Sequence, residues 1–341
     1  ETIYKDMIQQ VKDGVNLLNA NNPAIDGDLF YDGDINKWKK FGGSLLLRIG
    51  MRLSEVAPDL AKQTVADAVT IMSQPEDICL LRHDGSGKNA FKNPLSFRYL
   101  DDNFIESDAV KIGKTFMDYL KKTKDPRIHV YCSLKDGNTE FDKQFGLPNG
   151  YDSHTIADAP SGSFVGLENT SNFNINTILR LDAPTIFLMP SETKLLLAEA
   201  VLRNWTNGNA EVLYKEAITS SMKEQEIAYG TQGKITDEEI ETYLAQNLFS
   251  TANNTEKLQI IGEQYWVATF INGYESYANW RRTGYPKLIP TNYSGSMSPG
   301  VIPTRLPYPT DEYSINRANV DTANQQQGAD KVTTHIWWDI D

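Results

Sequence analysis

The sequence predicts a mainly α-helical fold in which helical segments alternate with long irregular ones. Apolar residues recur at helical spacing in 1–73 and 191–272, which is typical of amphipathic helices. Proline, glycine and asparagine are frequent in 74–190 and 273–341, where the helical period is seldom sustained. We therefore expect the first two stretches to be mainly helical and the other two to be rich in loops.

Three helices are expected in the first helical stretch. The first covers 3–18, and the second lies within 37–56, where Arg48 and Arg52 are four residues apart and so share one face. Pro58 begins the third, over 58–74, because the first turn of a helix tolerates proline.

The first loop-rich stretch contains one predicted helix. We expect irregular chain over 74–107 and 129–186, and a helix from Ser107 to Leu120 between them. This helix stops because Pro126 disfavours helical geometry at the residue before it. Irregular segments of this length in a compact domain are commonly functional.

The second helical stretch begins with a helical hairpin. Segments 191–205 and 209–230 are joined by the polar turn "TNGN", and their length and alanine content resemble a tetratricopeptide (TPR) hairpin. Thr236 and Glu239 then form a capping box. A further helix is expected over 255–273, and it ends near Gly273.

Charge and cysteine content narrow the class of protein. The net charge of −12 excludes the basic surface expected of a nucleic-acid-binding protein. Arginine interrupts the longest apolar runs, so no segment is expected to span a bilayer. The sequence leaves open whether Cys79 and Cys132 pair.

No set of residues predicts an active site. Ser191 and Lys194 have the Ser-x-x-Lys spacing of a serine β-lactamase nucleophile. The polar triplets that follow, at 277–279 and 282–284, are too close in sequence to line opposite walls of a cleft, and Ser191 suits a helix N-cap. We therefore expect no enzymatic activity and no cofactor.

No metal site is predicted either. Four histidines are scattered without paired spacing, at His83, His129, His154 and His335. Four aspartates lie in "DGDLFYDGD", and Asp-Gly turns explain them, with an irregular Ca²⁺ site as the alternative: Asp26, Asp28, Asp32 and Asp34.

Aromatic side chains in the loops are the candidates for ligand binding. Flat rings stack on the apolar faces of sugars, while neighbouring amides and carboxylates bond the hydroxyls. The alternative is that these rings anchor the loops to the core. Eight aromatic residues lie in the loop segments: Phe91, Phe97, Tyr99, Phe104, Phe141, Phe145, Tyr151 and Phe164. From the loops we select six candidates, Phe91, Tyr99, Tyr151 and Phe164 with Asn89 and Asp152 as hydroxyl partners.

Six segments in order resemble one protein family. They are 31–56, 124–131 ("KDPRIHVY"), 191–222, 271–288 ("INGYESYANWRRTGYPKL"), 305–316 ("RLPYPTDEYSIN") and 333–339 ("TTHIWWD"). Together they resemble the SusD/RagB outer-membrane nutrient-binding lipoproteins of Bacteroidetes, and the first two are most similar to the SusD-like subgroup.

The resemblance implies a single SusD-like domain over 1–341, in which TPR-like hairpins support an irregular, ligand-binding half. The family's lipobox cysteine and N-terminal repeats have no counterpart here, so we expect the chain to be the C-terminal two-thirds of the family's length. The resemblance also implies a non-catalytic cell-surface protein, held at the outer membrane by an N-terminal lipid anchor absent from this chain. Such a protein captures glycans as the lid of a TonB-dependent SusC-like transporter.

Two alternatives remain at this stage. The same lid mechanism serves peptides or other nutrients, and TPR-like helices can act as a scaffold for protein interactions. Ligand-contacting aromatics vary within the family, so the resemblance assigns no binding residue.

The segment "YANWRRTGYP", Tyr277–Pro286, has two interpretations. Its arginines and rings are able to clamp a ligand or to fasten the interior. Because the resemblance makes this segment a recurring family signature, we predict that Arg281 and Arg282 are interior fastenings, stacked on tryptophan and bonded to carboxylates or carbonyls.

Overall fold

Helices predominate in the structure, a computed structural model that describes residues 1–19, 21, 25–101, 110–152, 154–249, 253–293 and 295–340. The described residues form thirteen α-helices and four short strands. The predicted mainly α fold is therefore confirmed. Phe104 and the first residues of the helix expected over 107–120 lie outside the described residues.

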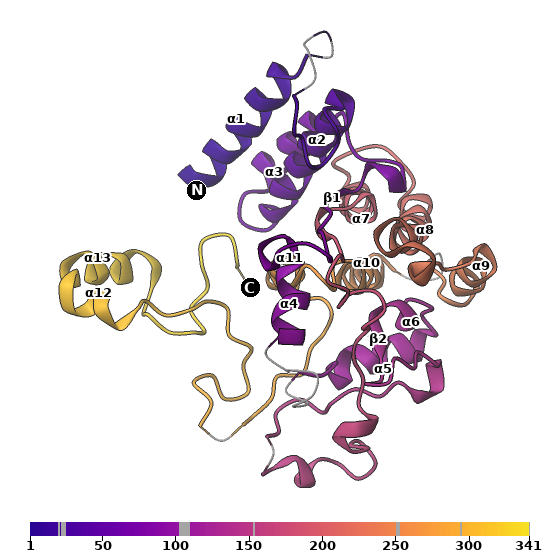
Figure 1. Ribbon diagram of the computed structural model, residues 1–341. Helices are drawn as coiled ribbons and strands as arrows, with labels where there is room; N and C mark the ends of the chain where they lie inside the picture. The colour runs from indigo at the N-terminus through magenta and orange to yellow at the C-terminus, as the bar shows by residue number, and fades with distance from the viewer. Residues whose placement is uncertain are drawn as a thin grey trace.

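The first three helices form a layer at one end of the molecule (Figure 1). They are α1 (Thr2–Leu17), α2 (Ile35–Arg52) and α3 (Pro58–Asp67). The Asp34 carboxylate begins α2 by accepting bonds from the backbone N–H groups of residues 36 and 37. α3 ends seven residues before the predicted position 74, because the chain turns back to bury Met72 against α2, where its N–H donates to Ser44 Oγ at 2.8 Å.

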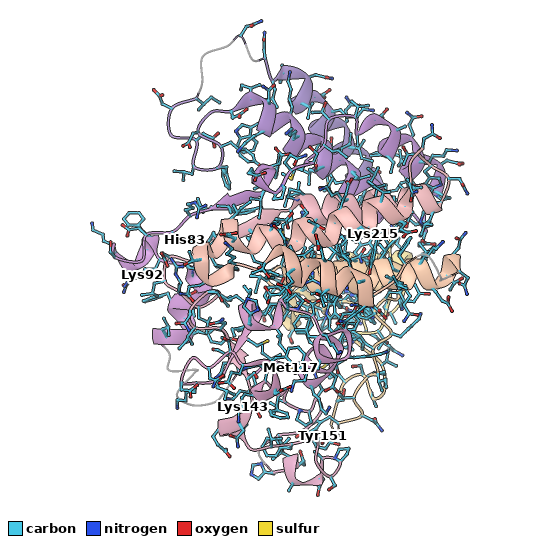
Figure 2. The ribbon with its side chains drawn as sticks, turned by 90° about the vertical axis from the view of Figure 1, so that its right-hand side faces the viewer. His83, Lys92, Met117, Lys143, Tyr151 and Lys215 are labelled. Atoms are coloured by element: carbon cyan, nitrogen blue, oxygen red, sulfur yellow. The ribbon has the colours of Figure 1, made fainter. Side chains whose placement is uncertain are left out.

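The centre of the molecule is the predicted helical hairpin. Its helices are α7 (Pro190–Leu202) and α8 (Ala210–Tyr229), and α10 (Asn254–Ala268) packs against α7. Figure 2 shows this layer between the first three helices and the loop-rich end that carries Tyr151. The predicted capping box begins α9 (Asp237–Gln246). Small or aliphatic side chains at the contact are almost completely buried, among them Leu195, Ala198, Ala217, Ile218 and Met222.

The loop-rich stretch 74–190 contains more regular structure than predicted. Its helices are α4 (Pro94–Asp101), α5 (Lys114–Thr123) and α6 (Ile128–Tyr131). Two antiparallel pairs join β1 (Cys79–Leu81) to β4 (Thr185–Leu188) and β2 (Cys132–Ser133) to β3 (Asn172–Phe173). The two cysteines lie in different pairs, buried and without a disulfide.

The chain after residue 273 is also more helical than predicted. Gly273 begins α11 (Gly273–Thr283) instead of ending a helix, because the Asn272 side chain accepts a bond from the Glu275 N–H and restarts helical geometry after a turn. Segment 277–286 is therefore largely helical. Two further helices, α12 (Thr310–Ile315) and α13 (Arg317–Gln327), lie to the side of the molecule (Figure 1).

Arg282 of α11 is buried and holds helices together in the interior, as predicted. Its Nη1 and Nη2 donate to the two oxygens of Glu199 on α7 at 2.6 and 2.7 Å. Further bonds reach Ser54, just after α2, at 3.0 Å and Asn279 at 2.7 Å. Although burial alone would raise the pKa of Glu199, Arg282 and then Arg203 hold this pKa below its usual value.

Arg281 points to the C-terminal segment. Its Nε donates to Asp339 at 2.8 Å, and its guanidinium lies 4.4 Å from the ring centre of Trp338 and 5.2 Å from that of Tyr277. The stacking on tryptophan that we predicted is therefore made with a distant residue and not with Trp280.

A second buried cluster lies beside the first. Arg48 of α2 donates to both oxygens of Glu192 on α7, at 2.5 and 2.6 Å, while Arg52 donates to Glu275 of α11. The Tyr265 hydroxyl of α10 lies within hydrogen-bond distance of both carboxylates, at 2.8 and 2.9 Å. Charged groups thus join α2, α7 and α11, and α10 adds the Tyr265 hydroxyl.

Replacing Arg282 with alanine is expected to destabilise the fold by about 3–5 kcal/mol, because Glu199 stays buried after losing its bidentate partner. Urea unfolding measures this change. The exposed pair between Arg317 and Asp321 is the control, and R317A is expected to cost less than about 0.5 kcal/mol. Equal stabilities of the two variants would contradict an interior role for Arg282.

Candidate functional site

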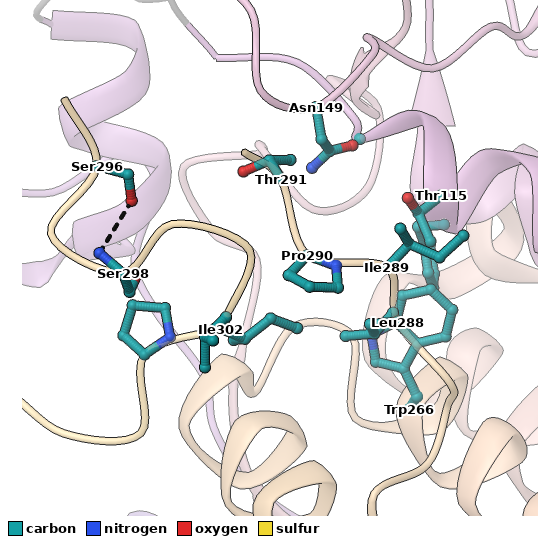
Figure 3. A pocket seen from close by; sticks show the side chains of 14 residues that line it. Thr115, Asn149, Trp266, Leu288, Ile289, Pro290, Thr291, Ser296, Ser298 and Ile302 are labelled. Carbon is teal, nitrogen blue, oxygen red and sulfur yellow. Dashed lines mark hydrogen bonds between the residues drawn. The ribbon is translucent and has the colours of Figure 1, made fainter. Parts of the chain in front are cut away.

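Two adjoining cavities form a groove at the loop-rich end of the molecule. Their volumes are about 490 and 510 Å³. Both are lined by Thr115, Asn149, Ile289, Pro290 and Thr291, so we treat them as one groove with a first and a second cavity. Its walls come from the start of α5, the 148–151 loop and the 288–303 segment (Figure 3).

Backbone hydrogen bonds position the α5 side of the groove. Lys114 N–H donates to the Leu147 carbonyl, and Leu147 N–H donates to the Ile112 carbonyl, both at 2.7 Å. Ile112 N–H in turn donates to Ser171 at 2.8 Å. The loop after Leu147 is thereby held against the first turn of α5, which brings Asn149 beside Thr115.

Gly150 allows the two loops of the groove to approach closely. Its φ of +88° is favoured only by glycine, and an added Cβ would lie 2.8 Å from the Thr291 Cβ. A larger residue here would push the 288–303 segment away from the 148–151 loop.

Trp266 of α10 supplies an aromatic wall to the first cavity and is only partly buried. Its ring meets Phe116 edge-on at 4.9 Å and 83°, and Tyr119 at 5.9 Å and 64°. Phe116 stacks on Phe270 at 4.2 Å. Because these neighbours are packed in the core, the tryptophan is held rigidly.

Polar side chains line the first cavity together with Trp266. Thr115 and Asn149 lie toward the α5 side, whereas Ser296 and Ser298 lie on the opposite side of the pocket (Figure 3). In the second cavity, the Ser163 hydroxyl is buried and has no hydrogen-bond partner among the described residues. The groove therefore combines aromatic rings, Trp266 in the first cavity and Tyr151 in the second, with separate hydroxyl and amide groups, an arrangement suited to a polyhydroxy ligand.

A hydrogen bond ties the two loops at the rim of the groove. The Tyr293 hydroxyl donates to Asp152, next to Tyr151 in the second cavity. Asp152 also accepts bonds from the N–H groups of His154 and Thr155. The bond from Tyr293 and then these backbone bonds lower the pKa of Asp152, so the carboxylate stays ionised and keeps the turn formed.

The structure brings some of the sequence candidates together and separates others. Tyr151 lines the groove, Asp152 lies at its rim, and Phe164 is half-buried next to Ser163. Asn89 and Phe91 lie outside the lining residues, beside Lys92 at another edge of the molecule (Figure 2).

Tyr99 packs in the core. It is 7% exposed and meets Phe173 edge-on at 5.6 Å. Its burial favours the alternative that loop aromatics anchor the chain, and we do not carry it forward as a ligand contact.

Several residues that line the groove were not predicted from the sequence. Trp266 lies in a predicted helix, and Ile289, Thr291 and Ser298 lie in a tail without periodicity. The only signal for Trp266 was an aromatic residue on a helix, which is far more often a core residue.

The acyl-enzyme interpretation of Ser191 does not fit the structure. Ser191 is fully buried at the start of α7, and its hydroxyl donates to Glu224 of α8 at 2.6 Å. Burial raises the pKa of Glu224 to about 7, although bonds from Ser191 and Ser220 oppose the change. These groups are out of reach of a substrate.

Neither metal ligation nor membrane insertion is indicated by the described residues. They contain no group of three or more His, Cys, Asp or Glu side chains arranged to hold a metal ion. The Asp28 carboxylate instead accepts bonds from the backbone N–H groups of 30, 31 and 33 and from the Trp38 indole. No described helix has both the length and the apolar character needed to cross a bilayer.

Comparison with known families gives a match over residues 1–309, to the SusD-like family described as starch-binding and associating with the outer membrane. The chain belongs to the SusD-like family. The family resemblance inferred from the six sequence segments is thereby confirmed. A comparison with curated proteins found no significant match.

Solved structures of SusD-like proteins share the whole fold. A chitin-binding protein is 30% identical with a TM-score of 0.84, covering 100% of this chain and 73% of its own. A SusD homologue from Bacteroides uniformis is 25% identical with a TM-score of 0.80, and the match covers 100% of this chain and 73% of the homologue. A chitin-binding SusD homologue from Flavobacterium johnsoniae, 24% identical with a TM-score of 0.81, covers 100% and 72% and shows the fold alone.

Replacing Gly150 with alanine is expected to destabilise this SusD-like protein more than the same change at Gly162. Both glycines have positive φ, but only at Gly150 does the new methyl group meet another loop. We expect an excess cost of about 1–3 kcal/mol in thermal or urea unfolding. Equal costs would show that the groove loops are not in close contact.

The contribution of Glu224 to the free energy of unfolding is expected to fall as pH rises from about 4.5 to about 7. The folded state binds the proton of this carboxyl more tightly than the unfolded state, so its contribution is present below pH 4.5 and is lost through pH 7. E224Q should remove this pH dependence, which amounts to on the order of 3 kcal/mol of unfolding free energy between pH 4.5 and pH 7.

The exposed Glu216 of the same helix provides the control for loss of one negative charge. Unfolding free energies of E224Q, E216Q and the parent protein are compared from pH 4 to pH 8. If E224Q and the parent protein keep a constant difference, Glu224 does not titrate as inferred.

Proposed function

We propose that this SusD-like protein binds glycans in the groove between the start of α5, the 148–151 loop and the 288–303 segment, and performs no chemistry on them. The observation that supports it best is the partly exposed Trp266 ring, which lines the first cavity together with hydroxyl and amide side chains and packs against Phe116 and Tyr119. Sugar rings present apolar C–H faces to aromatic rings and hydroxyls to polar side chains.

Two further observations support this function. The Ser163 hydroxyl is buried at the groove and has no hydrogen-bond partner among the described residues, and a ligand hydroxyl would satisfy it. The family is described as starch-binding, and the solved relative that is 30% identical is described as chitin-binding.

We further propose that the bound glycan is passed to a TonB-dependent SusC-like transporter, with the protein held at the cell surface by a lipid anchor. The family's description as associating with the outer membrane supports this location. The gene next to the one for this protein should then encode a TonB-dependent barrel. A neighbourhood without one would count against the transport partner while leaving glycan binding intact.

Calorimetry with neutral oligosaccharides tests glycan binding. Tyr151→Ala is expected to weaken binding about three- to tenfold through loss of an aromatic contact. Tyr274→Ala removes a tyrosine that is 92% exposed on α11, outside the groove lining, and should leave affinity unchanged.

The variant Phe91→Ala tests whether the ligand binds in the groove or at the candidate residues that lie outside it. Loss of affinity in this variant, with Tyr151→Ala unaffected, would move the site to the Asn89–Phe91 segment. Incubated oligosaccharides should also keep their length, since release of reducing ends would indicate hydrolysis. Binding of peptides in place of oligosaccharides would reverse the proposed ligand class.

A further inference from the structure

A separate cavity of about 580 Å³ lies between α13 and the segment 335–340, and we call it the C-terminal cavity. Its volume falls within the roughly 300–1,000 Å³ typical of small-molecule sites. The α13 wall lies at the side of the molecule (Figure 1). In the described part of the chain, no residue that lines this cavity also lines the groove. The two sites are therefore distinct.

The C-terminal wall presents an aromatic ring whose position is fixed. Trp337 lies against Tyr4 of α1, with ring centres 5.9 Å apart at 51°, and is only partly buried. Together with Ile336 it packs against the apolar core of the first three helices. The next residue, Trp338, is 8% exposed and lies 4.4 Å from the Arg281 guanidinium. Because both of its chain neighbours are anchored, the Trp337 ring needs little ordering when a ligand binds.

The carboxylate in the lining is already neutralised. Asp339 is 1% exposed and accepts a bond from Arg281 Nε at 2.8 Å, while His335 Nδ1 lies 3.2 Å from its other oxygen. A carboxylate held in this way keeps its position and leaves no net negative charge for a cationic ligand. His335 also lines the cavity, and its imidazole brings nitrogens that are able to form hydrogen bonds.

The α13 wall supplies two primary amides. Gln326 and Gln327 are exposed, and neither side chain bonds another described residue. Each amide carries two N–H donors and a carbonyl acceptor. Next to the lining, two buried atoms also lack a partner among the described residues: Asn324 Oδ1 on the same helix and Arg281 Nη2 beside Asp339. Buried polar groups of this kind are normally satisfied by water or by a ligand.

We infer that the C-terminal cavity is a second carbohydrate site, which takes a neutral sugar unit. One face of the sugar stacks on Trp337, and its hydroxyls bond the amides of Gln326 and Gln327. Residues 317–340 contain no strand, so neither wall offers an edge to an extended peptide. The site goes beyond the proposed function, because it shares no described residue with the groove and stands whether or not the groove binds glycans.

The indole N–H signals of the six tryptophans test the two sites separately in one NMR titration. Trp337 reports on the C-terminal cavity and Trp266 on the groove, and Trp337→Phe and Trp266→Phe assign the two signals. The probes are maltohexaose, cellohexaose and the neutral peptide N-acetyl-tetra-alanine amide. We expect the Trp337 signal to shift and saturate with at least one of the oligosaccharides and not with the peptide.

The outcomes separate this inference from the proposed function. A shift of Trp266 alone would overturn the second site and leave glycan binding in the groove intact. A shift of Trp337 alone would support the second site and count against the groove. Response of Trp337 to the peptide and to neither oligosaccharide would overturn the carbohydrate class. Absence of any shift at either tryptophan would contradict both sites.

Gln326→Ala removes an amide from the C-terminal cavity. The binding that Trp337 reports is expected to weaken about two- to tenfold through loss of a hydrogen bond, while the Trp266 titration stays unchanged. Gln325→Ala is the matched control, because Gln325 is exposed on the same helix outside the lining and should alter neither titration. Alanine favours helix formation, so both variants should retain α13. Equal effects of the two variants on the Trp337 titration would overturn the inference.

Discussion

The bidentate ion pairs between α7 and its neighbours are the interaction on which the rest of the structure depends. Glu192 and Glu199 lie two turns apart on α7, and each binds a guanidinium from a different helix, Arg48 of α2 and Arg282 of α11. A buried carboxylate is tolerated only when it is paired and bonded. The angle at which α2 and α11 cross α7 is therefore restricted to one that satisfies both pairs.

This restriction determines where the groove forms. α10 packs against α7 and contributes Tyr265 to the ion cluster, and the next residue, Trp266, faces the groove. Consecutive residues of a helix point in different directions, so one turn of α10 faces the charged interior on one side and the groove on the other. The aromatic neighbours Phe116 and Phe270 then hold the tryptophan against α5.

Buried ion pairs hold the helical half together, whereas the first cavity of the groove is lined without charged side chains among the described residues. Arginine and glutamate neutralise one another inside the helical half, while this cavity has hydroxyl, amide, aromatic and aliphatic groups. The segments that build the groove also have less regular backbone, which lets Gly150 and Thr291 approach closely. A rigid helical support and adaptable loops suit a family whose members bind different ligands on one fold.

The amino-acid sequence by itself determined most of the helical framework. Periodicity and capping residues such as Thr236 and Asp34 act locally, and they locate α2, α7, α8, α9 and α10. Local signals failed where a tertiary contact takes over, at the burial of Met72 that ends α3. The start of α11 is a different case, because the Asn272 cap is itself local and the apolar periodicity did not indicate it. Local signals also failed for α4 and α12, which are too brief to show a period, and for α13, in which Val320 is the one buried side chain.

Only the tertiary structure decided which side chains form the groove. Tyr151 was selected from sequence and lines the groove, with Asp152 next to it at the rim, but Tyr99 has the same residue type as Tyr151 and is buried in the core. Asn149, Trp266 and Thr291 come from segments far apart in the chain and meet because the ion pairs and aromatic contacts bring their elements together. Exposure of a ring depends on what packs over it, and that is a property of distant residues that no local pattern contains.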